Sequence, residues 1–193
     1  MGNKKVIIFN APPNTGKDVA AEHLVKHLNS KGIPSHHKEV KENLFKAVKS
    51  AYGISDNLWD FLYEREYKEE PSCHLRISMN NTSPRNAMIH MSENVLKPLF
   101  GKDVFGIMAA KSAEEGVNIF SDGGFAEEVQ CLLDEVGEEN FLLIHVTRDG
   151  CSFEGDSRDY VMGFPNTHII HNDGTLGEYL DCCEELVEEF LNE

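Results

Sequence analysis

The stretch from Lys5 to Asp18, KVIIFNAPPNTGKD, passes from an apolar segment into a turn that ends in Gly-Lys. Set against the pattern G-x-x-x-x-G-K-[ST], it has Ala11 for the first glycine, Gly16 and Lys17 in place, and Asp18 for the hydroxyl residue. A buried strand, this turn and a following amphipathic helix would point backbone N–H groups at an anion, which the lysine also reaches. The stretch therefore predicts a phosphate-binding loop rather than an ordinary strand–turn–helix junction.

The bulk properties of the chain fit a single globular domain. It has 193 residues, of which 40% are hydrophobic and 26% are charged, and such a chain can bury a sizeable core. No apolar stretch approaches the ~20 residues of a membrane span, and no secretory segment is evident. Five cysteines form an odd set without a C-x-x-C motif, which is typical of a reduced protein. We expect a cytoplasmic protein without membrane contact and leave its oligomeric state open, with a homodimer as one option.

The formal net charge of −15 restricts the class of partner. A surface that holds a nucleic-acid backbone needs clustered lysine and arginine, so the charge argues against a nucleic-acid partner. A small phosphorylated substrate stays compatible, because a few well-placed cations can hold it. The arginines that could do so lie in the middle of the chain and in one late loop: Arg65, Arg76, Arg85, Arg148 and Arg158.

Apolar runs and helical periodicities alternate along the chain. Strands are expected at residues 6–10, 35–40, 117–121, 141–147 and 168–171. Helices are expected at residues 18–31, 44–52, 57–67, 103–114, 126–136 and from 176 onwards. A further helix should run from 83 towards 97 and end or kink before Pro98. Loops are expected at 71–82 and 151–165. Strands separated by helices imply parallel crossovers. We predict a three-layer α/β domain with a parallel five-stranded sheet and a ligand site at the strand ends.

Three further side chains follow strands or lie in the late loop, where they would approach the phosphate-binding loop. Asp122 directly follows a predicted strand, so its carboxylate could hold Mg²⁺ or position an attacking oxygen; alternatively it caps the next helix. Arg148 ends another strand and Arg158 lies in the Gly- and Asp-rich insertion. Arginines on a closing loop suit the stabilisation of transition-state charge, although either could be a surface cation.

Six segments occur in the order seen in bacteriophage-type deoxynucleoside monophosphate kinases. They are NAPPNTGKD, REYKEEP, SPRNAMIHMSENVLKPLFGKDVFG, FSDGGFAEE, TRDGCSFEGDSR and HNDGTLGEYL. The chain resembles this family from end to end. The resemblance implies a P-loop NTPase fold of the adenylate-kinase type, ATP and Mg²⁺ as cofactors, and a deoxynucleoside monophosphate (dNMP) as the substrate.

The same resemblance implies how the chain is divided. A single kinase domain over residues 1–193 would have its core at 1–43, 102–148 and 166–193, with the first strand central in the sheet. An acceptor-binding helical region would span about 44–101 and a lid about 149–165. The implied activity is the ATP-dependent conversion of dNMP to the diphosphate for DNA precursor synthesis.

Site residues are also carried over by the resemblance. Lys17 would contact the β- and γ-phosphates. The residues expected around the donor nucleotide are Ala11, Pro13, Asn14, Thr15, Gly16, Lys17, Asp18, Asn172, Asp173 and Gly174. The residues expected to hold the acceptor phosphate are Arg65, Lys68 and Arg85. Lys68 is equally compatible with a solvated helix lysine, and the Asn-Asp-Gly segment with a plain turn capped by Asp173 or Thr175.

The sequence departs from the family pattern at two positions. Asp18 stands where a hydroxyl normally touches Mg²⁺, and we expect its carboxylate to bind the ion directly or through water, with Asp122 as the second metal candidate. Gly124 stands where many relatives carry an arginine, so one phosphate-clamping cation is absent from that position. Arg76 is the nearest spare arginine and our candidate substitute. The predicted catalytic set is Lys17, Asp122, Arg148 and Arg158.

Two other functions stay open at this stage. One is a P-loop kinase of another small acceptor, or of a modified pyrimidine in DNA. The other is a regulator that binds a nucleotide without turnover, against which the arginines of the predicted lid argue. The base-contact candidates are Trp59, Tyr63, Met88 and His90, each of which fits a core position equally well.

Overall fold

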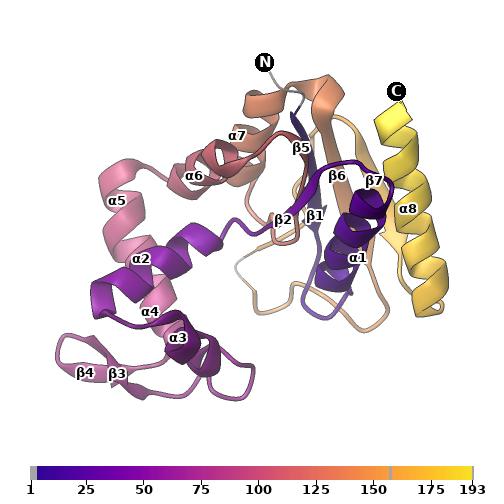
Figure 1. Ribbon diagram of the computed structural model, residues 1–193. Coiled ribbons are helices and arrows are strands. Elements are labelled where there is room, and N and C mark those ends of the chain that lie inside the picture. Colours follow the sequence, from indigo (N-terminus) through magenta and orange to yellow (C-terminus); the bar gives the residue numbers. More distant parts are fainter. Residues whose placement is uncertain (1–3, 157, 193) are drawn as a thin grey trace. The chain divides into compact units, whose positions relative to one another are not determined.

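The computed structural model describes residues 4–156 and 158–192. The chain forms two compact units, and Figure 1 shows the elements of each. The core unit consists of Met1–Val40 and Gly106–Glu193, and the inserted unit consists of Lys41–Phe105. Among the described residues, no helix combines the length and the apolar character that a membrane span needs.

The core unit is built on one sheet of five strands in the order β2-β5-β1-β6-β7. The strands are β1 (Lys4–Asn10), β2 (Ser35–Lys38), β5 (Gly116–Phe120), β6 (Phe141–Thr147) and β7 (Thr167–His171). Every neighbouring pair is parallel. The prediction of a parallel five-stranded sheet with the first strand in the middle is therefore confirmed. Because parallel strands end at the same edge, the segments that follow Asn10, Phe120 and Thr147 meet there.

Helices cover both faces of this sheet (Figure 1). On one face lie α1 (Lys17–Ser30) and α8 (Leu176–Asn192), and on the other lie α7 (Ala126–Val136) and α6 (Val104–Ser112), with a 3₁₀ turn at Glu138–Asn140 before β6. The face under α1 and α8 is an apolar cluster that includes Ile7, Phe9, Leu24, Leu28, Ile119, Ile144 and Val187. These are the three layers expected from the alternation of strands and helices.

The inserted unit has a small core of its own. Its elements are α2 (Glu42–Tyr52), α3 (Asp56–Leu62), the hairpin β3 (Ser72–Ile77) and β4 (Asn80–Thr82), α4 (Pro84–His90), a π-helical segment (Met91–Leu96) and α5 (Lys97–Phe100). Trp59 and Met88 are buried in that core, and Tyr63 stacks on Trp59 with ring centroids 5.3 Å apart. Among the base-contact candidates, these three side chains therefore pack as core.

Two local predictions in the inserted unit are wrong, because the helix expected at 57–67 ends at Leu62 and the segment 71–82 is not a loop. Residues 71–82 form a hairpin rather than a loop, because Ser78 and Met79 adopt positive φ values of 48° and 74° and make a two-residue turn. Such turns usually carry Asn-Gly or Asp-Gly, so this one gave no signal. The regular α-helix that starts after Ser83 is interrupted before Pro98 by the π-helical segment Met91–Leu96, the kind of irregularity at which helices kink, and one more turn, α5, follows. It stops at Gly101, where φ is 103°.

Candidate functional site

The phosphate-binding loop connects the end of β1 to the start of α1. Asn14 and Gly16 both have left-handed backbones, with φ values of 68° and 93°, and the Thr15 hydroxyl donates to the Pro12 carbonyl over 3.0 Å. Ala11 and Thr15 are buried, whereas Pro13 and Asn14 are exposed. The residues expected from the sequence thus form one compact turn at the N-terminus of a long helix, where the dipole and the N–H groups favour an anion.

Gly16 has no room for a side chain. A Cβ there would lie 2.8 Å from the Asn172 side-chain nitrogen and 3.2 Å from the Tyr179 ring. The same Asn172 amide donates to the Thr15 carbonyl over 2.7 Å. The turn after β7 and the helix α8 therefore hold the outer wall of the loop in place. Asn172 is buried, so it acts here as a support of the loop backbone.

Lys17 and Asp18 begin α1. The Lys17 side chain is only 10% exposed, and its Nζ lies 3.8 Å from an Asp18 carboxylate oxygen, while the Asp18 side chain is 57% exposed. The Lys17 side chain is thus largely shielded from solvent at the start of the helix that follows the loop. The exposed carboxylate next to it is accessible to a cation, as the interpretation of Asp18 as a metal ligand requires.

Arg148 lies against the loop. It follows β6, and one of its guanidinium nitrogens donates to the Asn14 carbonyl over 3.2 Å. Next to it, the Asp149 backbone N–H donates to the Asp173 carboxylate over 2.7 Å. The structure thus brings the predicted catalytic Arg148 and the Asn-Asp-Gly turn after β7, which is expected around the donor nucleotide, to the same end of the sheet as the phosphate-binding loop.

The turn after β7 also has the alternative role that the sequence left open. Thr175 and Glu178 form a capping box at the start of α8, in which the Thr175 hydroxyl accepts from the Glu178 N–H and the Thr175 N–H donates to the Glu178 carboxylate. The Thr175 N–H and hydroxyl both donate to the Glu178 carboxylate and thereby lower its pKa. The cap is Thr175, which leaves Asp173 to bind Asp149.

Asp122 follows β5 at the carboxyl edge of the sheet. One of its carboxylate oxygens accepts from the Val40 backbone N–H over 2.6 Å, which fixes the segment after β2 to the segment after β5. The residue is half-buried. Asp122 does not cap α7, which begins after Phe125. It therefore occupies the strand-end position from which a carboxylate can serve a bound nucleotide.

Arg158 is held in a bidentate pair with Asp156, with nitrogen–oxygen distances of 2.9 and 2.6 Å. These hydrogen bonds raise the pKa of Arg158, and the carboxylates of Asp122 and Glu128 act in the same direction. The stem of Arg158 runs over Gly124, where its Cδ lies 2.5 Å from the position of a Cβ. The space that a side chain at position 124 would take is thus occupied by the aliphatic stem of Arg158.

Asn10 is a functional position that the sequence reasoning missed. Its buried side chain donates to the Gly123 and Asp159 carbonyls over 2.9 and 3.1 Å and accepts from the Val161 N–H over 2.9 Å. It thereby connects β1 to the turn after Asp122 and to the second half of the predicted lid. A polar residue that ends a buried strand just before a Gly-Lys turn was the available signal.

The second half of the predicted lid is attached to the sheet at further points. The His145 ring nitrogen donates to the Val161 carbonyl over 3.0 Å, and the Tyr160 hydroxyl donates to the Val146 carbonyl over 2.9 Å. Burial lowers the pKa of His145, which therefore stays neutral and acts as a donor. The role of residues 149–165 as a moving lid remains a prediction.

Tyr179 contributes an unusual polar atom beside the loop. The side chain is buried, its ring packs against Gly16, and its hydroxyl interacts with the buried Cys183 thiol one turn further along α8. Burial also raises the pKa of the hydroxyl strongly.

The four predicted acceptor residues all belong to the inserted unit. The Arg85 N–H donates to the Lys68 carbonyl over 3.1 Å, and the Arg85 guanidinium pairs with Glu69 at 3.2 Å, so REYKEEP and SPR lie together. Arg65 and Arg76 are exposed. Arg76 lies on the β3–β4 hairpin, where its carbonyl accepts from the Tyr52 hydroxyl. Binding of an acceptor phosphate by these residues remains a prediction.

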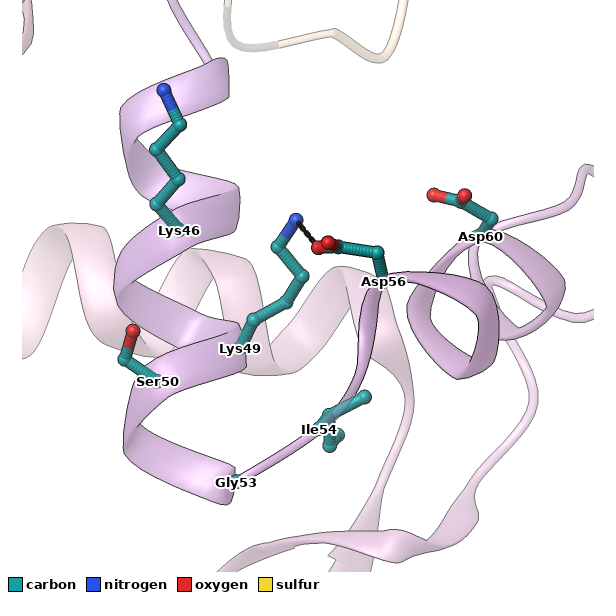
Figure 2. A pocket seen from close by; sticks show the side chains of 7 residues that line it. All are labelled: Lys46, Lys49, Ser50, Gly53, Ile54, Asp56 and Asp60. Atoms are coloured by element: carbon teal, nitrogen blue, oxygen red, sulfur yellow. Dashed lines mark hydrogen bonds and ion pairs between the residues drawn. The ribbon is translucent and has the colours of Figure 1, made fainter.

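A groove of about 690 Å³ lies within the inserted unit, between α2 and α3. Figure 2 shows Lys49 reaching from α2 to Asp56, at 2.5 Å, with Lys46 and Asp60 further along the two helices. Its lining residues are Lys46, Lys49, Ser50, Gly53, Ile54, Asp56 and Asp60. The charges of its two lysines and two aspartates balance. None of the predicted acceptor residues is among the residues that line this groove.

The chain is similar to known proteins in its structure rather than in its sequence. No protein-family model matches the sequence. No curated protein matches it either. The APS kinase CysC of Mycobacterium tuberculosis in complex with AMPPNP and APS is similar in structure, with a TM-score of 0.54 and 14% identity over 97% of this chain and 99% of that chain. The chain has the fold of a P-loop kinase. A cysteine-to-alanine mutant of the same enzyme gives a TM-score of 0.52 and 16% identity at the same coverage.

Proposed function

We propose that this chain is a phosphotransferase that uses ATP and Mg²⁺ to phosphorylate deoxynucleoside monophosphates. The observation that carries the proposal is the loop itself: a buried Lys17 at a helix start, a Gly16 without room for a Cβ, and Arg148 on the Asn14 carbonyl. A P-loop kinase with the same fold binds AMPPNP and APS, which supports a nucleotide as the donor.

The residues present fit ATP and Mg²⁺. Backbone N–H groups at the start of α1 and the Lys17 ammonium suit the donor phosphates, and Gly16 leaves the loop backbone open to them because it carries no side chain. The carboxylates of Asp18 and Asp122 are the hard oxygen ligands that Mg²⁺ prefers. When bound, Mg²⁺ would neutralise charge on the phosphates.

The chain's own groups would do the rest. Lys17 and Arg148 would hold the donor phosphates in line, and Arg158, once released from Asp156, would add charge stabilisation as the phosphoryl group moves. Asp122 would orient the acceptor oxygen or a metal ligand. Arg85 and Lys68, which the inserted unit places side by side, would hold the acceptor phosphate.

The identity of the acceptor follows from the resemblance and the charge. The net charge of −15 favours a free monophosphate over a nucleic-acid polymer. A kinase of another small acceptor is the second candidate, and the observation that favours it is Gly124, where the family arginine is missing.

One assay decides between these two candidates. ADP release should be measured by enzymatic coupling with ATP, Mg²⁺ and, in turn, each deoxynucleoside monophosphate, each ribonucleoside monophosphate and DNA containing a hydroxymethylated pyrimidine. We expect turnover with one or more deoxynucleoside monophosphates. Turnover only with DNA or with none of the acceptors would contradict the proposed acceptor.

Lys17→Ala is the control for the site. Loss of one preorganised charge at the transferring group should lower kcat by about 10²–10³. The variant should remain folded, because the change shortens a single side chain at the start of a helix, and a melting curve checks this. Turnover equal to that of the parent would mean that this loop is not the phosphate site.

A further inference from the structure

A second group of polar side chains lies where α1 packs on α8, and it has no part in the proposed phosphotransfer. The two helices share an apolar core through Leu24, Leu28, Cys183 and Val187. Beside that core, two histidines of α1 and two glutamates of α8 face one another, each pair four residues apart and so on one face of its helix. We call His23, His27, Glu184 and Glu188 the α1–α8 cluster.

The cluster is already assembled. Glu184 Oε1 lies 2.5 Å from His23 Nε2 and 3.1 Å from His27 Nδ1, so one carboxylate oxygen bridges both rings. His27 Nε2 in turn lies 2.8 Å from Glu188 Oε1. One donor atom each from His27, Glu184 and Glu188 falls within 4.8 Å of the others. The two imidazole rings stack at a centroid distance of 6.3 Å, and both therefore turn their nitrogens towards α8.

We propose that the α1–α8 cluster binds one zinc-class divalent metal ion. Two imidazole nitrogens and two carboxylate oxygens form a complete tetrahedral set for Zn²⁺, whose bonds of about 2.0–2.2 Å place ligand atoms about 3.3 Å apart. Glu184 already lies 2.5 Å from a His23 nitrogen and 3.1 Å from a His27 nitrogen, and the donor atoms of His27, Glu184 and Glu188 lie within 4.8 Å of one another. The four side chains must rearrange from these contacts to surround an ion. His27 supplies one nitrogen, and Glu188 turns from the other nitrogen towards the ion.

The surroundings of the cluster permit this rearrangement. The Glu188 side chain is 42% exposed and the His23 side chain 36% exposed, so solvent gives an ion access to both. Lys31 pairs with the same Glu188 oxygen and competes with a cation, but its side chain is 45% exposed and can turn away. His27, 17% exposed, and Glu184, 25% exposed, are the fixed part of the site.

A four-ligand site without an open position has a structural role. The ion would fasten α1, which begins at Lys17, to α8, whose Tyr179 ring packs on Gly16. The metal would thus hold the helix that carries the phosphate-binding loop against the helix that supports it. It takes no part in phosphoryl transfer, for which Mg²⁺ has other ligands.

The test uses the full chain, free of any histidine tag and stripped with a chelator. Zn²⁺ is titrated in competition with a chromophoric chelator, and Co²⁺ is titrated by visible absorption. We expect one equivalent of Zn²⁺ to bind and to raise the melting temperature, and Co²⁺ to give the intense absorption of a tetrahedral site. His27→Ala and Glu184→Gln should each weaken Zn²⁺ binding by at least the ~10–100-fold that even outer-shell changes cost.

His74→Ala is the matched control, because His74 is an exposed histidine of the inserted unit and should leave Zn²⁺ affinity unchanged. Cys182→Ser is the second control, since this exposed thiol lies on α8 beside the cluster. The proposal is overturned if the parent binds no stoichiometric Zn²⁺, or if binding survives in both cluster variants. It is equally overturned if Co²⁺ gives a thiolate charge-transfer band that Cys182→Ser removes.

Discussion

The Arg158 side chain lies directly over Gly124. A Cβ on Gly124 would meet Arg158 Cδ at 2.5 Å and Cγ at 2.8 Å, so the absence of a side chain at one position lets the other pass. The Arg158 guanidinium then forms a bidentate pair with Asp156, and the negative charge of Asp122 helps to raise its pKa. The glycine thus gives passage to the aliphatic stem of an arginine from another segment of the chain.

Gly124→Ala should lower kcat while the protein stays folded. The new methyl group must displace the Arg158 stem, because the two would otherwise overlap, and the guanidinium moves with it. Steady-state kinetics and a melting curve check this. Gly177→Ala is the control: its Cβ would come no closer than 4.0 Å to the Thr175 hydroxyl, so activity should be unchanged. Parent-like turnover in Gly124→Ala would mean that the position of Arg158 does not matter to the reaction.

Asp18→Ala should raise the Mg²⁺ concentration needed for half-maximal activity, and Asp18→Ser should restore part of it. The reason is that the exposed Asp18 carboxylate takes the place of the usual hydroxyl ligand. Mg²⁺ titrations of the parent and both variants at saturating ATP make the comparison. Identical Mg²⁺ curves would leave Asp18 with only the role of a first-turn acid that complements the helix dipole.

The sheet and the loop could be predicted because their signals are local. β1, β6 and α7 have strong apolar patterns, and the structure gives α7 and β6 the expected bounds. The Ser83-Pro84 cap was also correct, with the Ser83 hydroxyl accepting from the Asn86 N–H. In each case a few neighbouring residues determine the outcome.

The missed features depend on partners distant in the sequence or on rare backbone states. Asn10 binds Asp159 and Val161, about 150 positions away, and its place at the end of a buried strand indicates a special role but does not identify these partners. The hairpin turn at Ser78 and Met79 uses residues that seldom adopt positive φ. The overlap of Arg158 with Gly124 likewise needs coordinates, because it joins two loops that only the fold brings together.

The difference in stability between the parent and His145→Gln should fall as the pH is lowered below ~6.5. Burial lowers the pKa of His145 in the folded protein. Between that lowered pKa and the unfolded value of ~6.5, the unfolded chain therefore binds more protons than the folded protein. In this range the free energy of unfolding falls with falling pH, by at most ~1.4 kcal/mol per pH unit. The amide of His145→Gln would keep a donor for Val161 without titrating. Urea unfolding at pH 7.5 and 5.5 measures the effect. His168→Gln, at an exposed strand position, is the control, and equal pH dependence of parent and His145→Gln would contradict the prediction.

Arg85→Ala should chiefly raise the KM for the acceptor, whereas Arg158→Ala should chiefly lower kcat. Arg85 follows the capped start of α4, where its backbone is fixed to Lys68, so its contact with a phosphate would be made already in the ground state. Arg158 is held by Asp156 and must be released before it can act, so its contact would strengthen as the transition state forms. For Arg158→Ala we expect a loss of ~10²–10³ in kcat. Both parameters should be measured for both substrates. If Arg85→Ala changed only the KM for ATP, the acceptor region would be wrongly assigned, because an arginine of the inserted unit would then serve the donor.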